Sequence, residues 1–214
     1  MERKISVSLY ILAFAITVGI FAIGFYVGGI FTDMNLQGIS SNIDDVSKRV
    51  SSAELLFLLE DSPSFCPVYL DELSSIDAET DQLGQQLIYM EDVKEISDNE
   101  LKKNYFILET KSYLLSKRIK EKCNADYSLA LYFYSNIDCD KCKEQGEMLS
   151  SAKEKLEKNG VKLKVYSFDG EIGSPIAQAL IDKYNVTEYP SIVLNENIFS
   201  GFVSEGEIMK EINN

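Results

Sequence analysis

Residues 5–31 form one stretch without a charged side chain, and this feature limits what the N-terminal part of the chain can fold into. The stretch reads ISVSLYILAFAITVGIFAIGFYVGGIF. At about 1.5 Å per residue, a helix of this length exceeds the roughly 30 Å hydrocarbon core of a membrane. Residues 28–35 contain no A-x-A-like site at which a signal peptide would be cleaved. We therefore expect an uncleaved transmembrane helix that contacts the lipid bilayer.

The charges on either side of this stretch predict its orientation. Arg3 and Lys4 precede it, whereas the first basic residue after it is Lys48. Because positive charge favours the cytosolic side, residues 1–4 are expected in the cytosol and everything after Thr32 outside it. The predicted localisation is a single-pass protein of the cell membrane with an extracytoplasmic C-terminal part.

The composition excludes several classes of site and partner. The chain has no histidine and a formal net charge of -13. Pairs of serine or cysteine with histidine, and zinc sites that use histidine, are therefore excluded. An acidic surface repels phosphate backbones, so no nucleic-acid partner is expected. A structural zinc would need all four cysteines, and we expect no metal and no other cofactor.

Residues 32–127 are predicted to form an all-α region of three helices, at about residues 36–60, 67–92 and 98–122. Apolar residues recur there at steps of three and four, which is the helical period. Pro63 is expected to end the first helix, Pro67 suits the first turn of the second, and Ser97 with Glu100 forms a capping box before the third.

Short turns between these helices favour an antiparallel bundle within one chain. The same apolar stripes would also serve a coiled coil between two chains. Gly24 and Gly28 form a G-x-x-x-G pair that allows close packing of membrane helices. A homodimer through the transmembrane or helical region is therefore an open alternative.

Two cysteines flank the second and third predicted helices. Cys66 lies just before the second helix and Cys123 just after the third. The two helices are of nearly equal length, so antiparallel pairing would bring both cysteines to one end. We expect a structural disulfide between them, which would persist only in an oxidising compartment. The alternative is two unrelated buried thiols.

A second pair of cysteines follows a predicted strand. LALYFY at residues 129–134 is a continuous apolar run, as in a strand covered on both faces. After SNID come Cys139-Asp140-Lys141-Cys142 and a helical stretch to about Lys158. The beginning of a helix favours a thiolate over a thiol, so Cys139 is predicted to be the nucleophile. Cys142, one turn later, would then attack the mixed disulfide and release the partner.

The order of elements after this motif resembles the thioredoxin superfamily, including its membrane-anchored members of the thioredoxin and DsbA type. VKLKVYSF at residues 161–168 is expected to be a strand, and IAQALIDKY a helix. KYNVTEYPSIVL is similar to the family's loop with a proline before a strand. The resemblance covers residues 128–214 and implies an α/β thioredoxin-like domain, preceded by the transmembrane helix and the helical bundle or coiled-coil region.

The resemblance also implies an activity and a site. Tyr189-Pro190 would be a cis peptide beside the C-x-x-C, and Tyr189, Pro190, Asp140 and Lys141 would line a substrate groove. The implied activity is thiol-disulfide exchange with exported protein thiols or disulfides, or with a membrane redox partner. The alternative is a redox-inert interaction or scaffold module in which Cys139 and Cys142 form a structural disulfide.

Three departures from the family pattern affect this interpretation. The family's usual tryptophan before the motif and the Gly-Pro within it are missing, so the reduction potential cannot be transferred. Phe133 stands where many relatives have a buried acid, six residues before the first cysteine. The family's N-terminal strand and helix are also absent or replaced by the helical region.

Overall fold

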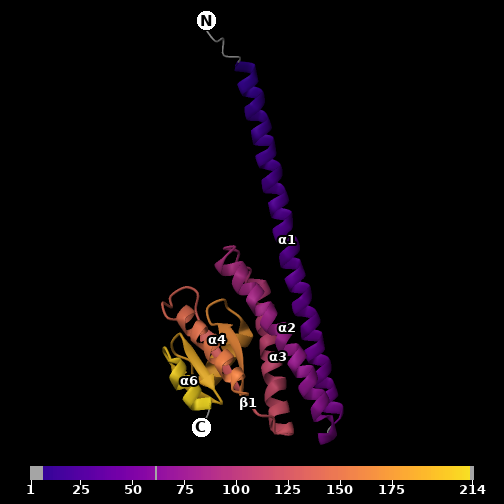
Figure 1. The fold of residues 1–214 in the computed structure, drawn as a ribbon, viewed down its shortest axis with the longest axis vertical. Helices are drawn as coiled ribbons and strands as arrows, with labels where there is room; N and C mark the ends of the chain where they lie inside the picture. Colours follow the sequence, from indigo (N-terminus) through magenta and orange to yellow (C-terminus); the bar gives the residue numbers. More distant parts are fainter. Residues whose placement is uncertain (1–6, 61, 213–214) are drawn as a thin grey trace. The chain divides into compact units, whose positions relative to one another are not determined.

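The computed structural model describes residues 7–60 and 62–212 of the 214-residue chain (Figure 1). The predicted cytosolic N-terminus, with Arg3 and Lys4, lies outside the described residues. The chain divides into two units, residues 1–41 and residues 42–214.

Helix α1, Val7–Leu59, covers both the predicted membrane helix and the first predicted helix of the α-region in one element. The sequence analysis placed a break between residues 31 and 36, where the structure has continuous helix. The intervening sequence is TDMN, which contains no glycine or proline, so no residue there favours ending a helix.

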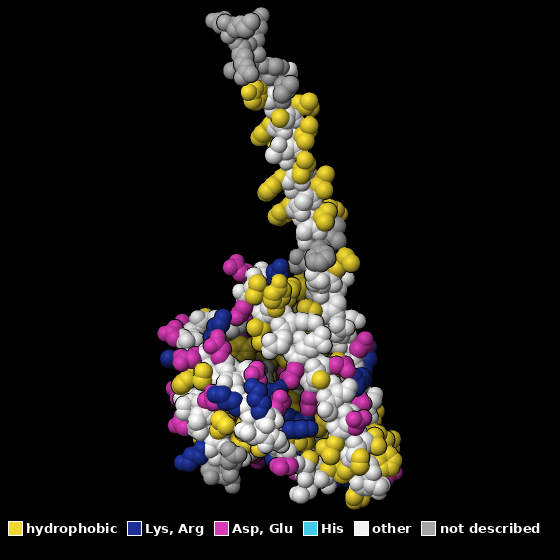
Figure 2. Space-filling view, in the orientation of Figure 1, with side chains coloured by type: hydrophobic (Ala, Val, Ile, Leu, Met, Phe, Trp, Pro, Cys, Tyr) yellow, Lys and Arg dark blue, Asp and Glu magenta, His cyan; other side chains and the backbone are white. Residues whose placement is uncertain are grey.

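The N-terminal half of α1 exposes its apolar side chains. Phe14, Phe21 and Phe25 are each more than two-thirds exposed, and Figure 2 shows hydrophobic side chains all along this part of the helix. Among the described residues, α1 is the one helix long and apolar enough to cross a membrane, judged by length and composition.

Residues 42–59 of α1 join two further helices in the second unit. A 3-10 turn η1, Pro63–Phe65, leads into α2, Cys66–Asp92, and then α3, Asn99–Cys123. The residues buried between these helices are mainly aliphatic: Ile43, Val46, Val50, Leu73, Ile76, Leu83, Leu108 and Leu115. Arg49 of α1 also pairs with Glu72 at 2.8 Å and with Glu79.

The cap of α3 differs from the prediction. Asp98, not Ser97, is the N-cap, and its carboxylate accepts the N–H groups of Glu100 and Leu101 at 3.0 Å. Ser97 instead donates to Glu91 on α2. Both residue types cap helices well, so the sequence did not distinguish two adjacent candidates.

The C-terminal part of the chain is built on a four-stranded sheet in the order β2-β1-β3-β4. Its strands are β1, Tyr127–Tyr134; β2, Lys162–Asp169; β3, Ser191–Leu194; and β4, Asn197–Ser200. β1 pairs with β2 in parallel and with β3 antiparallel, and β3 pairs with β4 antiparallel. The helices are α4, Cys142–Lys158; α5, Pro175–Tyr184; and α6, Glu205–Ile212.

Helices cover both faces of this sheet, which explains the continuous apolar run of β1. Ala130 and Tyr132 of β1 face the core formed with α4 and α6. On the other face, Phe133 stacks on Phe168, whose ring packs against Phe106 of α3. Figure 1 shows the sheet between α4 on one side and α3 on the other.

Helix α3 therefore packs against the other helices on one side and against the sheet on the other. α3 and the sheet lie in the same compact unit, residues 42–214. One buried face of α3 is the predicted apolar stripe. Its second buried face carries polar and aromatic residues that the stripe left out: Lys102, Phe106, Ser112, Tyr113 and Ser116.

Candidate functional site

The C-x-x-C motif lies between the end of β1 and the beginning of α4. β1 ends at Tyr134, and α4 begins at Cys142 with Lys141 as its N-cap. Cys139 lies in the turn before the helix, and its carbonyl accepts the N–H of Cys142 at 3.3 Å. The unpaired N–H groups and the dipole at the beginning of a helix favour negative charge there.

The two sulfurs of the motif are bonded to each other but have different surroundings. Cys139 and Cys142 form a disulfide. Cys139 is partly exposed, whereas Cys142 is only 5% exposed. The backbone N–H of Ser135 donates to the sulfur of Cys142 at 3.4 Å. The outer cysteine is thus partly open to solvent, while the inner one is buried with its sulfur against a hydrogen-bond donor.

The residues between the two cysteines are exposed. Lys141 pairs with Glu144 at 2.6 Å, and its ammonium lies 5.5 Å from the centre of the Phe202 ring. Asp138 and Asp140 are exposed as well. These charged groups are therefore open to solvent, where ion pairs are weak.

The proline loop lies at the same end of the sheet. Tyr189-Pro190 is a cis peptide, and Pro190 directly precedes β3. Ser191, the first residue of β3, pairs with Phe133 near the end of β1. The strand register therefore brings Pro190 level with the end of β1 from which the C-x-x-C loop leaves.

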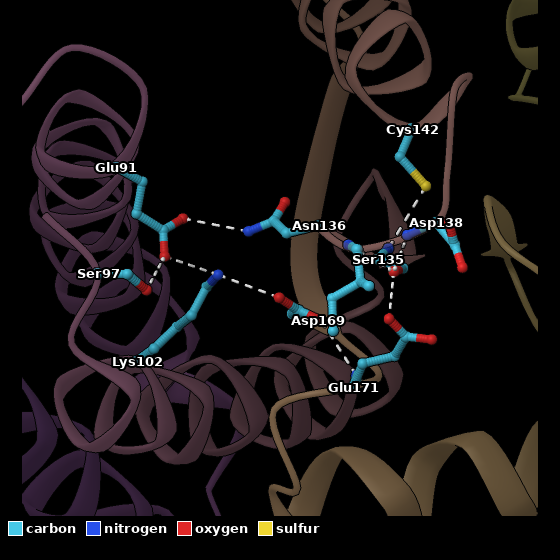
Figure 3. A network of polar contacts seen from close by, with 10 residues as sticks. Glu91, Ser97, Lys102, Ser135, Asn136, Asp138, Cys142, Asp169 and Glu171 are labelled. Carbon is cyan, nitrogen blue, oxygen red and sulfur yellow. Dashed lines mark hydrogen bonds and ion pairs between the residues drawn. The ribbon is translucent and has the colours of Figure 1, made fainter. Parts of the chain in front are cut away.

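The side chain of Tyr189 packs against the loop after β2. A methyl group added to Gly170 would lie 2.3 Å from the ring carbon Cζ of Tyr189, so only glycine leaves room for this ring. Burial, followed by the charges of Glu171 and Asp169, raises the pKa of Tyr189. Tyr189 thus lies beside two acidic residues that belong to the polar network of Figure 3.

That network contains residues that the sequence analysis did not select. Figure 3 shows polar contacts that run from Glu91 and Lys102 on the helices, through Asp169 and Glu171, to Ser135 below Cys142. Asp169 and Lys102 are almost fully buried. No sequence pattern indicates a buried role for Lys102, because a lysine in a polar helical stretch is usually solvated.

A buried glutamine also fixes α4. The side chain of Gln145 donates to the carbonyl of Val203 at 3.0 Å and accepts the N–H of Val203 at 2.6 Å. These two bonds connect the first turn of α4 to the segment before α6. Gln145 therefore helps hold the helix that carries Cys142, although it does not touch the sulfur.

The other two cysteines lie away from this loop. Cys66, the first residue of α2, is bonded to Cys123, the last residue of α3, with their Cα atoms 5.6 Å apart. All four cysteines are thus in two disulfides. Within residues 7–60 and 62–212, no group of three or more Cys, Asp or Glu side chains could hold a metal ion.

Comparisons with known proteins give a limited picture. No protein-family model and no curated protein matches the chain. Among solved structures, that of a chloroplastic thioredoxin z is similar, with 18% identity over 46% of this chain and 86% of that chain, and a TM-score of 0.34. At this level the likeness carries no argument about activity.

The predicted fold class is nevertheless confirmed by the architecture itself. The chain has a long apolar N-terminal helix, a helical region, and a mixed sheet in which a strand leads through C-x-x-C into a helix. With a helix on each face and a proline before β3, the C-terminal part resembles the thioredoxin fold. The described residues contain no strand before β1 in this sheet, and α3 covers the face beside it.

Proposed function

We propose that this chain is a membrane-anchored thiol-disulfide oxidoreductase that acts on the extracytoplasmic side. Cys139 is the nucleophile and Cys142 the resolving cysteine. The observation that carries the proposal is the difference between the two sulfurs of one disulfide, at the point where β1 leads into α4. Cys139 is partly exposed, whereas Cys142 is buried with its sulfur beside an N–H donor.

The proposed exchange proceeds in two steps. In reductive exchange, the thiolate of Cys139 attacks one sulfur of a substrate disulfide, and the other substrate sulfur leaves as a thiolate and takes up a proton. Cys142 then loses its proton to solvent and attacks the sulfur of Cys139. This forms the Cys139–Cys142 disulfide and releases the second substrate thiolate. Two electrons have moved from the protein to the substrate, and the reverse sequence oxidises two substrate thiols.

The surroundings of the motif suggest where a substrate would bind. Tyr189 and Pro190 lie at the same end of the sheet as the C-x-x-C, and Asp140 and Lys141 are exposed within the motif. These four residues are proposed to shape a groove for an extended segment of an exported protein or a membrane redox partner. The apolar half of α1 would hold the site near the bilayer.

Trapping of mixed disulfides tests this function. In a Cys142→Ser variant the thiolate of Cys139 can still attack a partner disulfide, but no resolving thiol releases the product. We expect covalent adducts on non-reducing gels of membranes that express the variant, which dissolve on addition of reductant. Cys139→Ser/Cys142→Ser is the matched control and should give none. If Cys142→Ser gives no adducts, the redox-inert module is the better description.

The reduction potential of the pair then assigns the direction of exchange. Equilibration with glutathione buffers measures it, with mass spectrometry to follow residues 139 and 142 separately from residues 66 and 123. A value of about -120 mV would indicate an oxidant, and one of about -270 mV a reductant.

A further inference from the structure

Lys102 is a buried cation on a helix that lies outside the C-x-x-C segment. It is in the first turn of α3 and only 4% exposed. Its ammonium group contacts Glu91 at 2.8 Å and Asp169 at 3.1 Å, and lies 5.6 Å from the centre of the Tyr134 ring. A buried ammonium group is tolerated when such partners surround it.

Two chains of contacts lead from Lys102 to the same turn (Figure 3). In the first, the other carboxylate oxygen of Asp169 accepts the N–H of Glu171 at 3.0 Å, and the Glu171 carboxylate accepts the hydroxyl of Ser135. In the second, Glu91 accepts the side-chain amide of Asn136 at 3.4 Å. Both chains end at the two residues that directly follow β1.

This turn holds the inner sulfur of the disulfide. The N–H of Ser135 donates to the sulfur of Cys142 at 3.4 Å. The hydroxyl of Ser135 also accepts the N–H groups of Ile137 at 3.0 Å and Asp138 at 3.3 Å, and so orders the chain that leads to Cys139. An N–H donor aimed at a sulfur stabilises its thiolate form.

A structural explanation alone does not account well for this arrangement. Replacing a buried ion pair by apolar residues of similar size is often neutral or stabilising, so stability gives little reason for a lysine here. Phe133, which is stacked on Phe168, has no ionisable group to place below the motif. The charged groups near the turn instead come from α2, α3, the end of β2 and the loop after it.

We propose that Lys102 is a positioning residue of the redox site: together with Asp169 and Glu91 it fixes the Ser135–Asn136 turn, which keeps the Ser135 amide on the sulfur of Cys142. The inference rests on the proposed exchange activity and deepens it. It makes the helical hairpin of α2 and α3 a working part of the redox site, whereas the sequence analysis treated the helical region separately.

The test is Lys102→Met in the full chain, reconstituted in detergent micelles. Two quantities are measured: the equilibrium constant of the 139/142 pair with glutathione, and the pH dependence of the alkylation rate of reduced Cys139. In this variant the Ser135 amide is misaligned, and Asp169 and Glu91 are left without their cation. The thiolate form of the reduced cysteine pair is therefore less stable. We expect the equilibrium to shift toward the disulfide by about threefold to tenfold, and the alkylation profile to move to higher pH.

Lys103→Met is the matched control, because Lys103 is the next residue on α3 but is paired only with exposed Glu100 at 2.8 Å. It should leave both quantities unchanged. Because Lys102→Met leaves Asp169 buried without its cation and could prevent folding, Glu171→Ala provides a second variant. Glu171 is exposed, and its loss interrupts only the first chain of contacts. A shift of about twofold in the same direction is expected.

The outcomes separate this inference from the proposed function. If the unmodified chain exchanges with glutathione but Glu171→Ala and any folded Lys102→Met variant match it in both quantities, Lys102 has only a structural role and the inference is overturned. If the unmodified chain itself shows no exchange at residues 139 and 142, the proposed function fails first.

Discussion

The two disulfides are the same covalent bond in two different settings. Cys66–Cys123 joins residues 57 positions apart, at the N-terminus of α2 and the C-terminus of α3. Cys139–Cys142 joins residues three positions apart, at the junction of a strand and a helix. The first closes a long loop of the chain, whereas the second closes almost none.

The effect of each disulfide therefore depends on the residues and the length of chain around it. The 66–123 bond restricts a helical hairpin, so its main effect is expected on the unfolded chain. The 139–142 bond has little chain to restrict, but it has a partly exposed cysteine, a helix beginning beside it and an amide donor on the inner sulfur. We therefore interpret the first as a clamp and the second as a reactive centre.

Unfolding measurements under non-reducing conditions should give the largest separation between the two. In the chain-entropy model, removing a cross-link over 57 positions costs about 4 kcal/mol, and removing one over three positions costs about 1.5 kcal/mol. We expect urea unfolding of Cys66→Ala/Cys123→Ala and of Cys139→Ala/Cys142→Ala to show this order. Equal losses would contradict the distinction between clamp and reactive centre.

The pH dependence of the free energy of unfolding offers a second way to separate the helical hairpin from the C-x-x-C segment. Glu109 of α3 is 3% exposed, and burial raises its pKa from 4.5 to about 8. The charged groups that act on it are Asp77 and Asp81 of α2 and Lys153 of α4, and Tyr105 on its own helix donates a hydrogen bond to it. The folded chain therefore keeps a proton that the unfolded chain has lost.

The sign follows from this difference in bound protons. The contribution of Glu109 to stability is fully present below about pH 4.5 and is lost as the pH rises through about 8. Between pH 6 and pH 8 the free energy of unfolding should fall by about 2 kcal/mol more in the unmodified chain than in Glu109→Gln. Denaturation curves at several pH values measure this, with exposed Glu147→Gln as control. Identical slopes in all three proteins would show that Glu109 is ionised when folded.

The smallest predicted effect concerns the binding of a protein substrate at the C-x-x-C end of the sheet. In Gly170→Ala the new methyl group would collide with the Tyr189 ring and displace it from its position against the loop after β2. We expect KM for a protein disulfide substrate to rise by about threefold, with the equilibrium against glutathione unchanged. Gly206→Ala, where an added methyl group meets no atom within 4 Å, is the control. A change in the glutathione equilibrium instead would place Tyr189 in contact with the sulfurs.

The sequence predicted those parts of the molecule that depend on local spacing. C-x-x-C after an apolar run and proline before a short strand are patterns within short segments, and the pairing of Cys66 with Cys123 follows from the equal lengths of two neighbouring helices. The strands and helices of the C-terminal part follow from the same kind of pattern. The end of α1 before Pro63 does as well, because proline interrupts helical hydrogen bonding.

Other parts were not predictable, because they depend on contacts between distant segments. Lys102 and Asp169 are 67 positions apart, and nothing in either segment indicates that they meet. The second buried face of α3 was missed because it includes Ser112, Tyr113 and Ser116, which a search for aliphatic stripes ignores. The buried hydroxyl of Ser116 finds its partner in a distant segment, where it pairs with that of Tyr166 at 2.7 Å.

The strand order has a consequence for solubility. β2 is an edge of the described sheet, so one row of its backbone N–H and C=O groups has no neighbouring strand. Exposed edges of this kind invite a second molecule to add a strand, and lysines are a common protection. β2 carries Lys162, which is exposed, and Lys164, which is paired with Asp77 on α2. A molecule that docks its own strand here would have to desolvate these ammonium groups, which discourages fibrous self-association through this edge.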